Sequence, residues 1–293
     1  MDKYSSQQRG YFFAVLAAFQ WSLMGIFGKV LFQYQIAPLT VVALRSTLVL
    51  VTLIIILALF RRQWLIIRRS DLPFFVAYGL IGVAAGFFLY FTAIDLAGVA
   101  IAAILLYTYP VFVTILSVIF LGEHITKSKV MALILTLAGV VLVSEIGVSV
   151  AGQVNPLGVV ASLFAAVATA THSIFGKKAV QQYSSWTILL YSMGFGAFFL
   201  MAAQLILHGF PNLARPPVFW GALLALAWIS TLGANLAYIS ALKHVEASRA
   251  SIMATVEPVI VVVLAYAFFH EMLSPIQIFG TVLVLVGVFV VQR

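Results

Sequence analysis

The sequence predicts an all-α integral membrane protein of ten transmembrane helices, arranged as two inverted five-helix repeats with both termini in the cytoplasm. Three observations lead to this fold. The residues are too apolar for a protein that faces water, the basic residues fall almost entirely in alternate loops, and the second half of the chain repeats the first.

Composition excludes a water-soluble surface. Apolar residues make up 64% of the 293 positions and charged residues only 8%, whereas soluble domains carry about 25% charged residues. A spanning helix needs about 20 apolar residues, so the length accommodates roughly ten spans with short loops. The absence of Cys excludes a disulfide framework and thiol chemistry.

Short connections separate the apolar stretches, as in helical hairpins. The expected spans are 11–32, 38–60, 73–94, 98–120, 128–148, 156–176, 185–207, 218–242, 249–270 and 275–292. Asn155-Pro156 and Ser274-Pro275 each place an N-cap residue before a proline at the first helical position. These pairs predict the starts of the sixth and tenth spans.

The placement of charge predicts the topology. Thirteen of the sixteen basic residues fall on one side of the membrane: Lys3, Arg9, Arg61, Arg62, Arg68, Arg69, Lys127, Lys129, Lys177, Lys178, Lys243, Arg249 and Arg293. The opposite loops hold only Arg215, and Lys29 and Arg45 fall within spans. Because basic loops stay in the cytoplasm, we expect both termini there, in an inner or plasma membrane. The net charge of +8 is therefore a topology signal and does not indicate nucleic-acid binding.

The second half of the chain repeats the first at an offset of 148 residues. The matches include Ile26–Lys29 with Ile174–Lys177, Tyr90 with Tyr238, Pro110 with Pro258, and Gly139 with Gly287. The repeats cover residues 10–148 and 156–292 and hold five spans each. Since five is odd, the halves cross the membrane in opposite orientations, as in secondary transporters whose substrate site lies near the midplane between the halves. We therefore expect a transporter of a small molecule.

The chain resembles the EamA-type members of the drug/metabolite transporter superfamily over roughly residues 10–291. The matching features are the two five-span repeats, Trp21 within AAFQWSLMGIFGK, Arg45 in the second span, a proline in spans four and nine, and Leu121-Gly122-Glu123. The second half departs from the pattern, with Phe269-His270-Glu271 in place of Leu-Gly-Glu. The resemblance implies this fold and membrane transport. The substrates of the family include amino acids, other metabolites, drugs and quaternary amines.

Glu257 is the first candidate for the mechanism. It lies near the middle of the ninth span, directly before Pro258. Ionisable residues within a membrane are functional by default, and burial disfavours the charged form. We expect Glu257 to exchange a proton or to hold a substrate ammonium. The structural alternative is a partner for Arg45 or for a buried hydroxyl. Its repeat partner is Tyr109, so the halves are not chemically equivalent here.

Arg45 and the two prolines each have a functional and a structural interpretation. Arg45 could meet a substrate carboxylate, or could instead snorkel outward or join two helices. Pro110 and Pro258 free backbone carbonyls one turn earlier, near Leu106 and Ala254. These carbonyls could bind substrate or permit bending, or the prolines could make static kinks.

A set of polar and aromatic residues falls within the spans and could line a cavity for a small zwitterion or an aromatic cation. The members of the set are Gln20, Trp21, Tyr90, Tyr107, Tyr109, His172, Asn235 and Tyr238. Taken singly, each such residue is more often part of a core. His172 could relay protons or pack between helices.

Two other groups of residues have structural interpretations. Gly82 and Gly86 form a small-residue motif that lets a helix approach closely, and their repeat partners Ser230 and Ala234 are also small, so spans three and eight should pack tightly. Glu123 and Glu271 end helices, where loop hydrogen bonding or gating is expected and metal binding is not.

We therefore expect export of a small organic metabolite, an amino acid or a related amine, by alternating access. The coupling species would be a proton, and no cofactor or metal is expected. The partners are the substrate and the lipid bilayer, and the sequence does not fix the oligomeric state. The alternatives are a drug or quaternary-cation exporter, and a membrane protein with an enzymatic or scaffolding role. The lack of GxSxG, P-loop and HExxH motifs argues against an enzyme.

Overall fold

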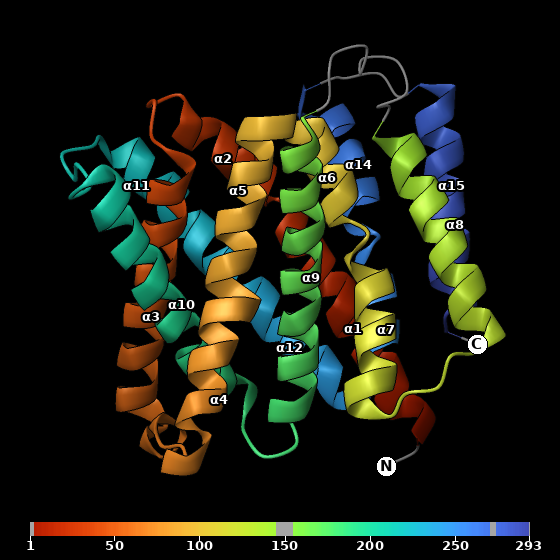
Figure 1. The fold of residues 1–293 in the computed structure, drawn as a ribbon, viewed down its shortest axis with the longest axis horizontal. Coiled ribbons are helices and arrows are strands. Elements are labelled where there is room, and N and C mark those ends of the chain that lie inside the picture. Colours follow the sequence, from red (N-terminus) through yellow and green to blue (C-terminus); the bar gives the residue numbers. More distant parts are fainter. Residues whose placement is uncertain (1–2, 145–154, 270–273, 293) are drawn as a thin grey trace.

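The computed structural model describes residues 3–144, 155–269 and 274–292, and every regular element in these ranges is helical (Figure 1). The first half contains α1 (Lys3–Ser22), α2 (Met24–Phe32), α3 (Pro38–Phe60), η1 (Arg62–Leu65), η2 (Arg69–Asp71), α4 (Leu72–Ala77), η3 (Tyr78–Ala85), α5 (Gly86–Ala97), α6 (Val99–Leu106), α7 (Tyr109–Leu121) and α8 (Lys127–Val143). The second half contains α9 (Pro156–Ala179), α10 (Ser185–His208), α11 (Pro217–Ala225), η5 (Leu226–Gly233), α12 (Ala234–His244), α13 (Ala247–Ala254), α14 (Glu257–Phe269) and α15 (Pro275–Val290).

Eight helical segments among the described residues are long and apolar enough to cross a membrane. They correspond to the expected spans one to four and six to nine. The fifth and tenth expected spans correspond to the shorter helices α8 and α15, of 17 and 16 residues. Eight spans are therefore supported by length and composition, and the number ten stays a prediction.

The predicted helix starts are confirmed at both proline sites. The Asn155 side chain accepts a hydrogen bond from the Leu157 N–H at 3.0 Å. The Ser274 hydroxyl accepts one from the Gln277 N–H at 3.1 Å, and the Gln277 side chain accepts one from the Ser274 N–H at 3.0 Å. This reciprocal capping box satisfies two amides that the first turn would otherwise leave without partners.

Contacts between α8 and α15, which lie side by side in Figure 1, obey a twofold relation. A Cβ added at Gly139 would lie 2.6 Å from Cγ2 of Val284, and one added at Gly287 would lie 2.7 Å from Cγ2 of Thr136. Each residue of the first contact has its repeat partner in the second. The sequence repeat is thus also a repeat of packing, with the two halves exchanged.

The first span of each half packs along the third span of the other half. A Cβ added at Gly10 would lie 2.6 Å from Cγ1 of Val245 in this packing, and one added at Gly158 would lie 2.6 Å from Cβ of Ala97. The halves are therefore interleaved, and the space between them is bordered by helices of both.

The small residues of span three serve this interleaved packing. A Cβ added at Gly82 would lie 3.2 Å from Cα of His172 in α9, and one added at Gly86 would lie 3.6 Å from Cβ of Ala168 in the same helix. Span three therefore packs against span six. Span eight, which carries Ser230 and Ala234, packs in the equivalent way against span one.

Two π-helical segments interrupt the spans at equivalent places in the repeats. The segments are η3 and η5, of eight residues each, and they begin at Tyr78 and Leu226, which are repeat partners. Both segments lie within spans that were expected at 73–94 and 218–242. Because π-helices are rare and concentrate at functional sites, their presence at equivalent places indicates that the third and eighth spans contribute to such a site.

Spans four and nine are each broken into two helices, which is a larger interruption than the expected kink. The first break separates α6 from α7 at Tyr107 and Thr108, and the second separates α13 from α14 at Thr255 and Val256. Pro110 and Pro258 lie in the first turns of α7 and α14, where the missing N–H removes no helical bond. The Thr108 hydroxyl donates to the Leu105 carbonyl, and the Thr255 hydroxyl donates to the Ile252 carbonyl, both at 2.6 Å. Side chains thus satisfy some of the carbonyls at each break.

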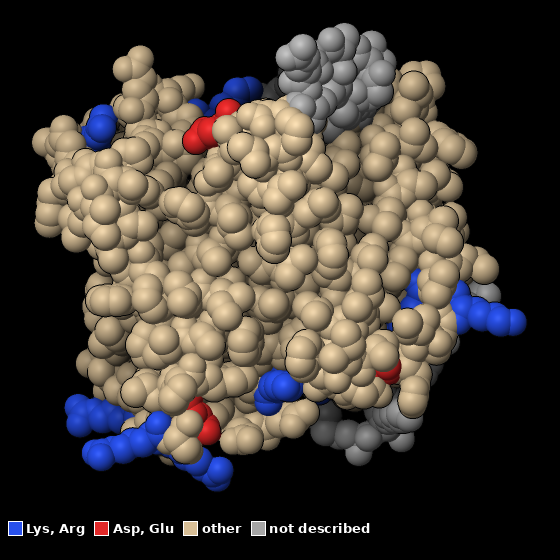
Figure 2. Space-filling model, in the orientation of Figure 1, with Lys and Arg blue, Asp and Glu red and all other residues tan. Residues whose placement is uncertain are grey.

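The two ends of the molecule differ in charge and in packing. Lys and Arg side chains gather mainly at the lower end in Figure 2, and both termini lie toward this end (Figures 1 and 2). In the lower half α13 packs against α7. The equivalent helices of the upper half, α6 and α14, make no comparably extensive contact within their described residues.

The close contact of α8 and α15 predicts an effect on stability. Gly139→Ala should lower the melting temperature in detergent, because the new Cβ would clash with Val284 and the Gly280 carbonyl. Overpacking of this kind lowers the free energy of unfolding by about 1–3 kcal/mol. The matched control is Gly221→Ala, where a Cβ would meet nothing within 4 Å. Equal melting temperatures for the two variants would contradict this packing.

Candidate functional site

A cavity of about 260 Å³ lies between the two halves. Its walls come from spans one to four and six to nine. The predicted site residues that line it are Trp21, Arg45, Tyr90, Tyr107, Tyr109, His172, Asn235, Tyr238 and Glu257. The volume is slightly below the roughly 300–1,000 Å³ typical of drug-sized sites, which suits a small metabolite.

Three predicted residues lie outside the lining. Gln20 faces η5 instead, and a Cβ added at Gly233 would lie 2.7 Å from its Nε2. The buried Oε1 of Gln20 has no hydrogen-bond partner. Pro110 and Pro258 act indirectly, because the breaks they accompany place other residues at the cavity.

The break in span nine places Glu257 at the first position of α14. The N-terminus of a helix carries partial positive charge and stabilises an anion. The Glu257 carboxyl interacts with Tyr107, which lies at the break in span four. The two interruptions therefore meet at one side of the cavity. Of the structural partners expected for Glu257, the hydroxyl is present and Arg45 is not.

Arg45 lies on the middle part of α3 and is only 3% exposed. Its NH1 donates to the Met24 sulfur at 3.4 Å, and its guanidinium carbon lies 4.4 Å from the centre of the Phe87 ring. Its Nε has no hydrogen-bond partner, and the described residues supply no ion pair for it. Since Arg45 is buried among Met24 and Phe87, it does not snorkel to water.

Aromatic residues form another wall of the cavity. The ring centres of Trp21 and Tyr238 lie 5.3 Å apart, and the Tyr238 hydroxyl is 2.8 Å from the Ser173 hydroxyl. The His172 ring packs edge-on against Tyr78 at 5.2 Å, and its Nε2 has no partner. His172 thus has packing contacts while one ring nitrogen remains available at the cavity.

Several lining residues were missed by the sequence analysis. They include Met24, Gly82, Phe87, Thr169, Ser173, Ser230 and Thr231. Gly82 and Ser230 are repeat partners on the two π-helical segments, and their small side chains leave room for the cavity. Their shared smallness was visible in the sequence, where packing was favoured over a role in ligand binding.

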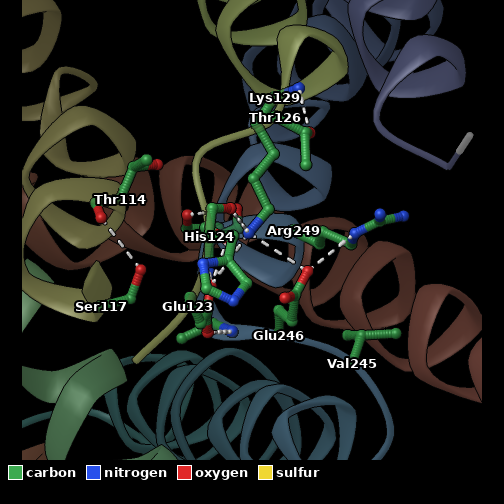
Figure 3. Close-up of polar contacts among 12 residues, drawn as sticks. Thr114, Ser117, Glu123, His124, Thr126, Lys129, Val245, Glu246 and Arg249 are labelled. Atoms are coloured by element: carbon green, nitrogen blue, oxygen red, sulfur yellow. Dashed lines mark hydrogen bonds and ion pairs between the residues drawn. The ribbon is translucent and has the colours of Figure 1, made fainter. Parts of the chain in front are cut away.

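Below the cavity, Glu123 joins the two halves (Figure 3). Glu123 follows α7 and is 8% exposed. Its carboxylate accepts hydrogen bonds from the Ala247 N–H at 2.6 Å, the Ser248 N–H at 3.3 Å and the Ser248 hydroxyl. These donors open α13, so Glu123 of the first half caps a helix of the second. The hydrogen bonding expected of Glu123 is therefore present, and it is made between halves. Glu271 lies outside the described residues.

Lys129 extends this contact into a network (Figure 3). Its ammonium lies 3.4 Å from Glu123 and 3.2 Å from Glu246, and donates to the His124 carbonyl at 2.9 Å. Glu246 also pairs with Arg249 at 3.0 Å. Lys129 is 2% exposed, and its several acceptors offset the cost of burying its charge.

A second cavity, of about 650 Å³, lies on the other side of this network. Its walls include Glu123, Glu246, Lys177 and the loop residue Tyr183. The Tyr183 hydroxyl donates to Asp71 in the same wall. Partial burial and this hydrogen bond raise the pKa of Tyr183. The charged network thus separates a polar cavity from the mainly aromatic one.

This geometry agrees with what the chain is similar to. The model of the EamA-like transporter family matches it twice, over residues 8–145 and 156–293. The chain belongs to the EamA-like transporter family. Each half of the chain thus matches the family model separately, in agreement with the two repeats. Together with the apolar helices, the match shows a multi-pass membrane protein of a transporter family.

Individual relatives support the same assignment. An uncharacterised transporter of Archaeoglobus fulgidus is 30% identical over 266 residues, which are 88% of this chain and 90% of that protein. The pseudopaline exporter CntI of Pseudomonas aeruginosa is 27% identical over 287 residues, 97% of this chain and 96% of that protein. A protein of Streptantibioticus cattleyicolor named "Probable terminal-alkyne amino-acid exporter" is 23% identical over 234 residues, 77% of this chain and 75% of that protein.

The fold also has a solved counterpart. A crystal structure with 18% sequence identity superposes with a TM-score of 0.82, covering 99% of this chain and 98% of the other. At this identity the likeness shows the shared fold alone.

The Glu123 network predicts a change in accessibility. Because the chain has no Cys, Ser117→Cys would supply one thiol on α7, at a residue that is 0% exposed. Glu123→Ala should speed its labelling by a maleimide, since the contact between α7 and α13 would lose its carboxylate.

Glu246→Ala is the comparison variant, measured in the same Ser117→Cys background. Glu246 is 41% exposed, and exposed ion pairs contribute only about 0–1 kcal/mol, so its effect should be smaller. Equal labelling rates with and without Glu123 would show that the network does not hold the halves together.

Proposed function

We propose that this protein is a secondary active transporter that exports an amino acid or a related amine by alternating access. The observation that carries the proposal is the small cavity between two inverted halves, with the carboxyl group of Glu257 in its wall. A carboxylate among apolar helices can bind a substrate ammonium, and inverted repeats provide the same packing in both directions.

The packing supports alternating access. The two cavities are separated by the Glu123 network and by the contact of α7 with α13, where the Tyr109 hydroxyl donates to the Ser251 carbonyl at 3.2 Å. The equivalent contact in the other half, between α6 and α14, is less extensive among the described residues. This asymmetry corresponds to a state closed at the basic end. If basic loops mark the cytoplasm, the cavity then faces outward.

Proton coupling is part of the proposal. Glu257 would bind a proton in one state and the substrate ammonium in another, since one carboxylate does not hold both at once. Glu257 lies at the break in span nine and beside Tyr107 at the break in span four. The exchange of proton and substrate would therefore change contacts of both spans. Competition of this kind links proton and substrate movement without a cofactor.

The names of two relatives support the substrate class. One is named as an exporter of pseudopaline and the other as an exporter of an amino acid. The second candidate function is export of a drug or quaternary cation. The Trp21 and Tyr238 rings favour it, because aromatic faces attract cations.

Transport by purified protein in liposomes tests the proposal. Wild type should show saturable counterflow with one or more labelled amino acids or amines. In Glu257→Gln the rate should no longer change with pH, because the amide cannot titrate. Asp95→Asn is the matched control, since Asp95 is exposed and outside the cavity.

An unchanged pH profile in Glu257→Gln would remove Glu257 from proton coupling. Counterflow of quaternary cations without any of amino acids would favour the second candidate. The absence of exchange of any compound, by protein that is folded, would contradict the proposal.

A further inference from the structure

We infer that Arg45 is the carboxylate-binding residue of the cavity, so that the substrate is a zwitterion held between Arg45 and Glu257. This inference rests on the proposed transport function and narrows its substrate class. An amine without a carboxylate, including a quaternary cation, would leave Arg45 without its partner.

Arg45 is buried at the cavity without a counterion among the described residues. Its side chain lines the same cavity as Glu257, yet the described residues provide no carboxylate in ion-pair contact with it. Removing a charge from water without a partner is expensive. Lys129, the other buried cation among the described residues, is neutralised by ion pairs with Glu123 and Glu246.

The contacts of Arg45 leave N–H donors of its guanidinium without a strong acceptor. A guanidinium offers five N–H donors, and NH1 of Arg45 donates to the weak acceptor sulfur of Met24. Nε donates to nothing, and the guanidinium stacks near Phe87. Apart from the Phe87 ring, the positive charge has no partner among the described residues, and a carboxylate would supply one.

The chemistry of the guanidinium suits a carboxylate. Its planar fork matches a carboxylate in a bidentate pair. The contact with the Phe87 ring, at 4.4 Å from the ring centre, holds the guanidinium in place without occupying its N–H donors. Lys would supply only a point charge at this position.

Groups that can carry opposite charges lie in one cavity without pairing. Glu257 interacts with Tyr107 and makes no ion pair with Arg45. If Arg45 and Glu257 formed an ion pair in the empty cavity, that ion pair would compete with the substrate for both side chains. The remaining walls include Trp21 and Met193, which would contact the uncharged part of the molecule.

The test uses three matched panels of compounds with the purified protein. The first panel contains apolar and aromatic L-amino acids, the second contains the amines left by removing each carboxylate, and the third contains the acids left by removing each amino group. Thermal stabilisation gives the affinities, and inhibition of counterflow gives the same ranking in liposomes.

We expect wild type to bind its best amino acid at least tenfold more tightly than the matched amine or acid. Arg45→Gln should lose about tenfold or more for the amino acid, as expected from one charge-assisted contact, and little for the amine. Arg45→Lys should recover part of the loss. Arg61→Gln, at an exposed position outside the cavity, should behave as wild type.

Amines that bind wild type as well as their parent amino acids would overturn the inference, even if Arg45 variants fail to fold. So would an Arg45→Gln protein that keeps the preference for the zwitterion. Counterflow of amines alone would leave the transport function standing and remove the zwitterion. The absence of binding by all three panels would overturn both the zwitterion and the amino-acid class.

Discussion

The cost of keeping charge away from water governs how this molecule is built. Only 8% of its residues are charged, and the few inside the helical bundle are handled in two ways. Glu123 and Lys129 are surrounded by partners at 2.6–3.4 Å, and they tie the halves together. Arg45 and Glu257 share a cavity without pairing with each other. The first pair serves the architecture, and the second is available to a ligand.

The inverted repeat explains why these charges can serve transport. Equivalent glycines let equivalent helices pack closely in both halves, so one pattern of packing is present in two orientations. The residues of the cavity break this symmetry, since the repeat partner of Glu257 is Tyr109. The packing is broken as well, because α7 meets α13 more closely than α6 meets α14. A symmetric frame with asymmetric chemistry can bind a substrate at one place and open in two directions.

Much of the fold could be predicted because it depends on local patterns. Span positions follow from apolar length, the starts at Asn155 and Ser274 follow from capping chemistry, and the repeat is visible in matched residues. The site was harder to predict. Most of the predicted polar and aromatic site residues do line the cavity, but Gln20 turns toward Gly233. The π-helical segments, the complete breaks at the prolines and the Glu123 bridge depend on contacts between residues more than 100 positions apart or on helix register, which no local pattern reveals.

Accessibility of the cavity itself tests the central claim most directly. Ala103→Cys places the protein's one thiol in the cavity wall on α6. An impermeant maleimide added from the side opposite the basic termini should label it, and a transported amino acid should slow the reaction by occupying the cavity. Labelling from the basic side alone, or labelling that no transported compound slows, would contradict a substrate site that opens away from the Glu123 network.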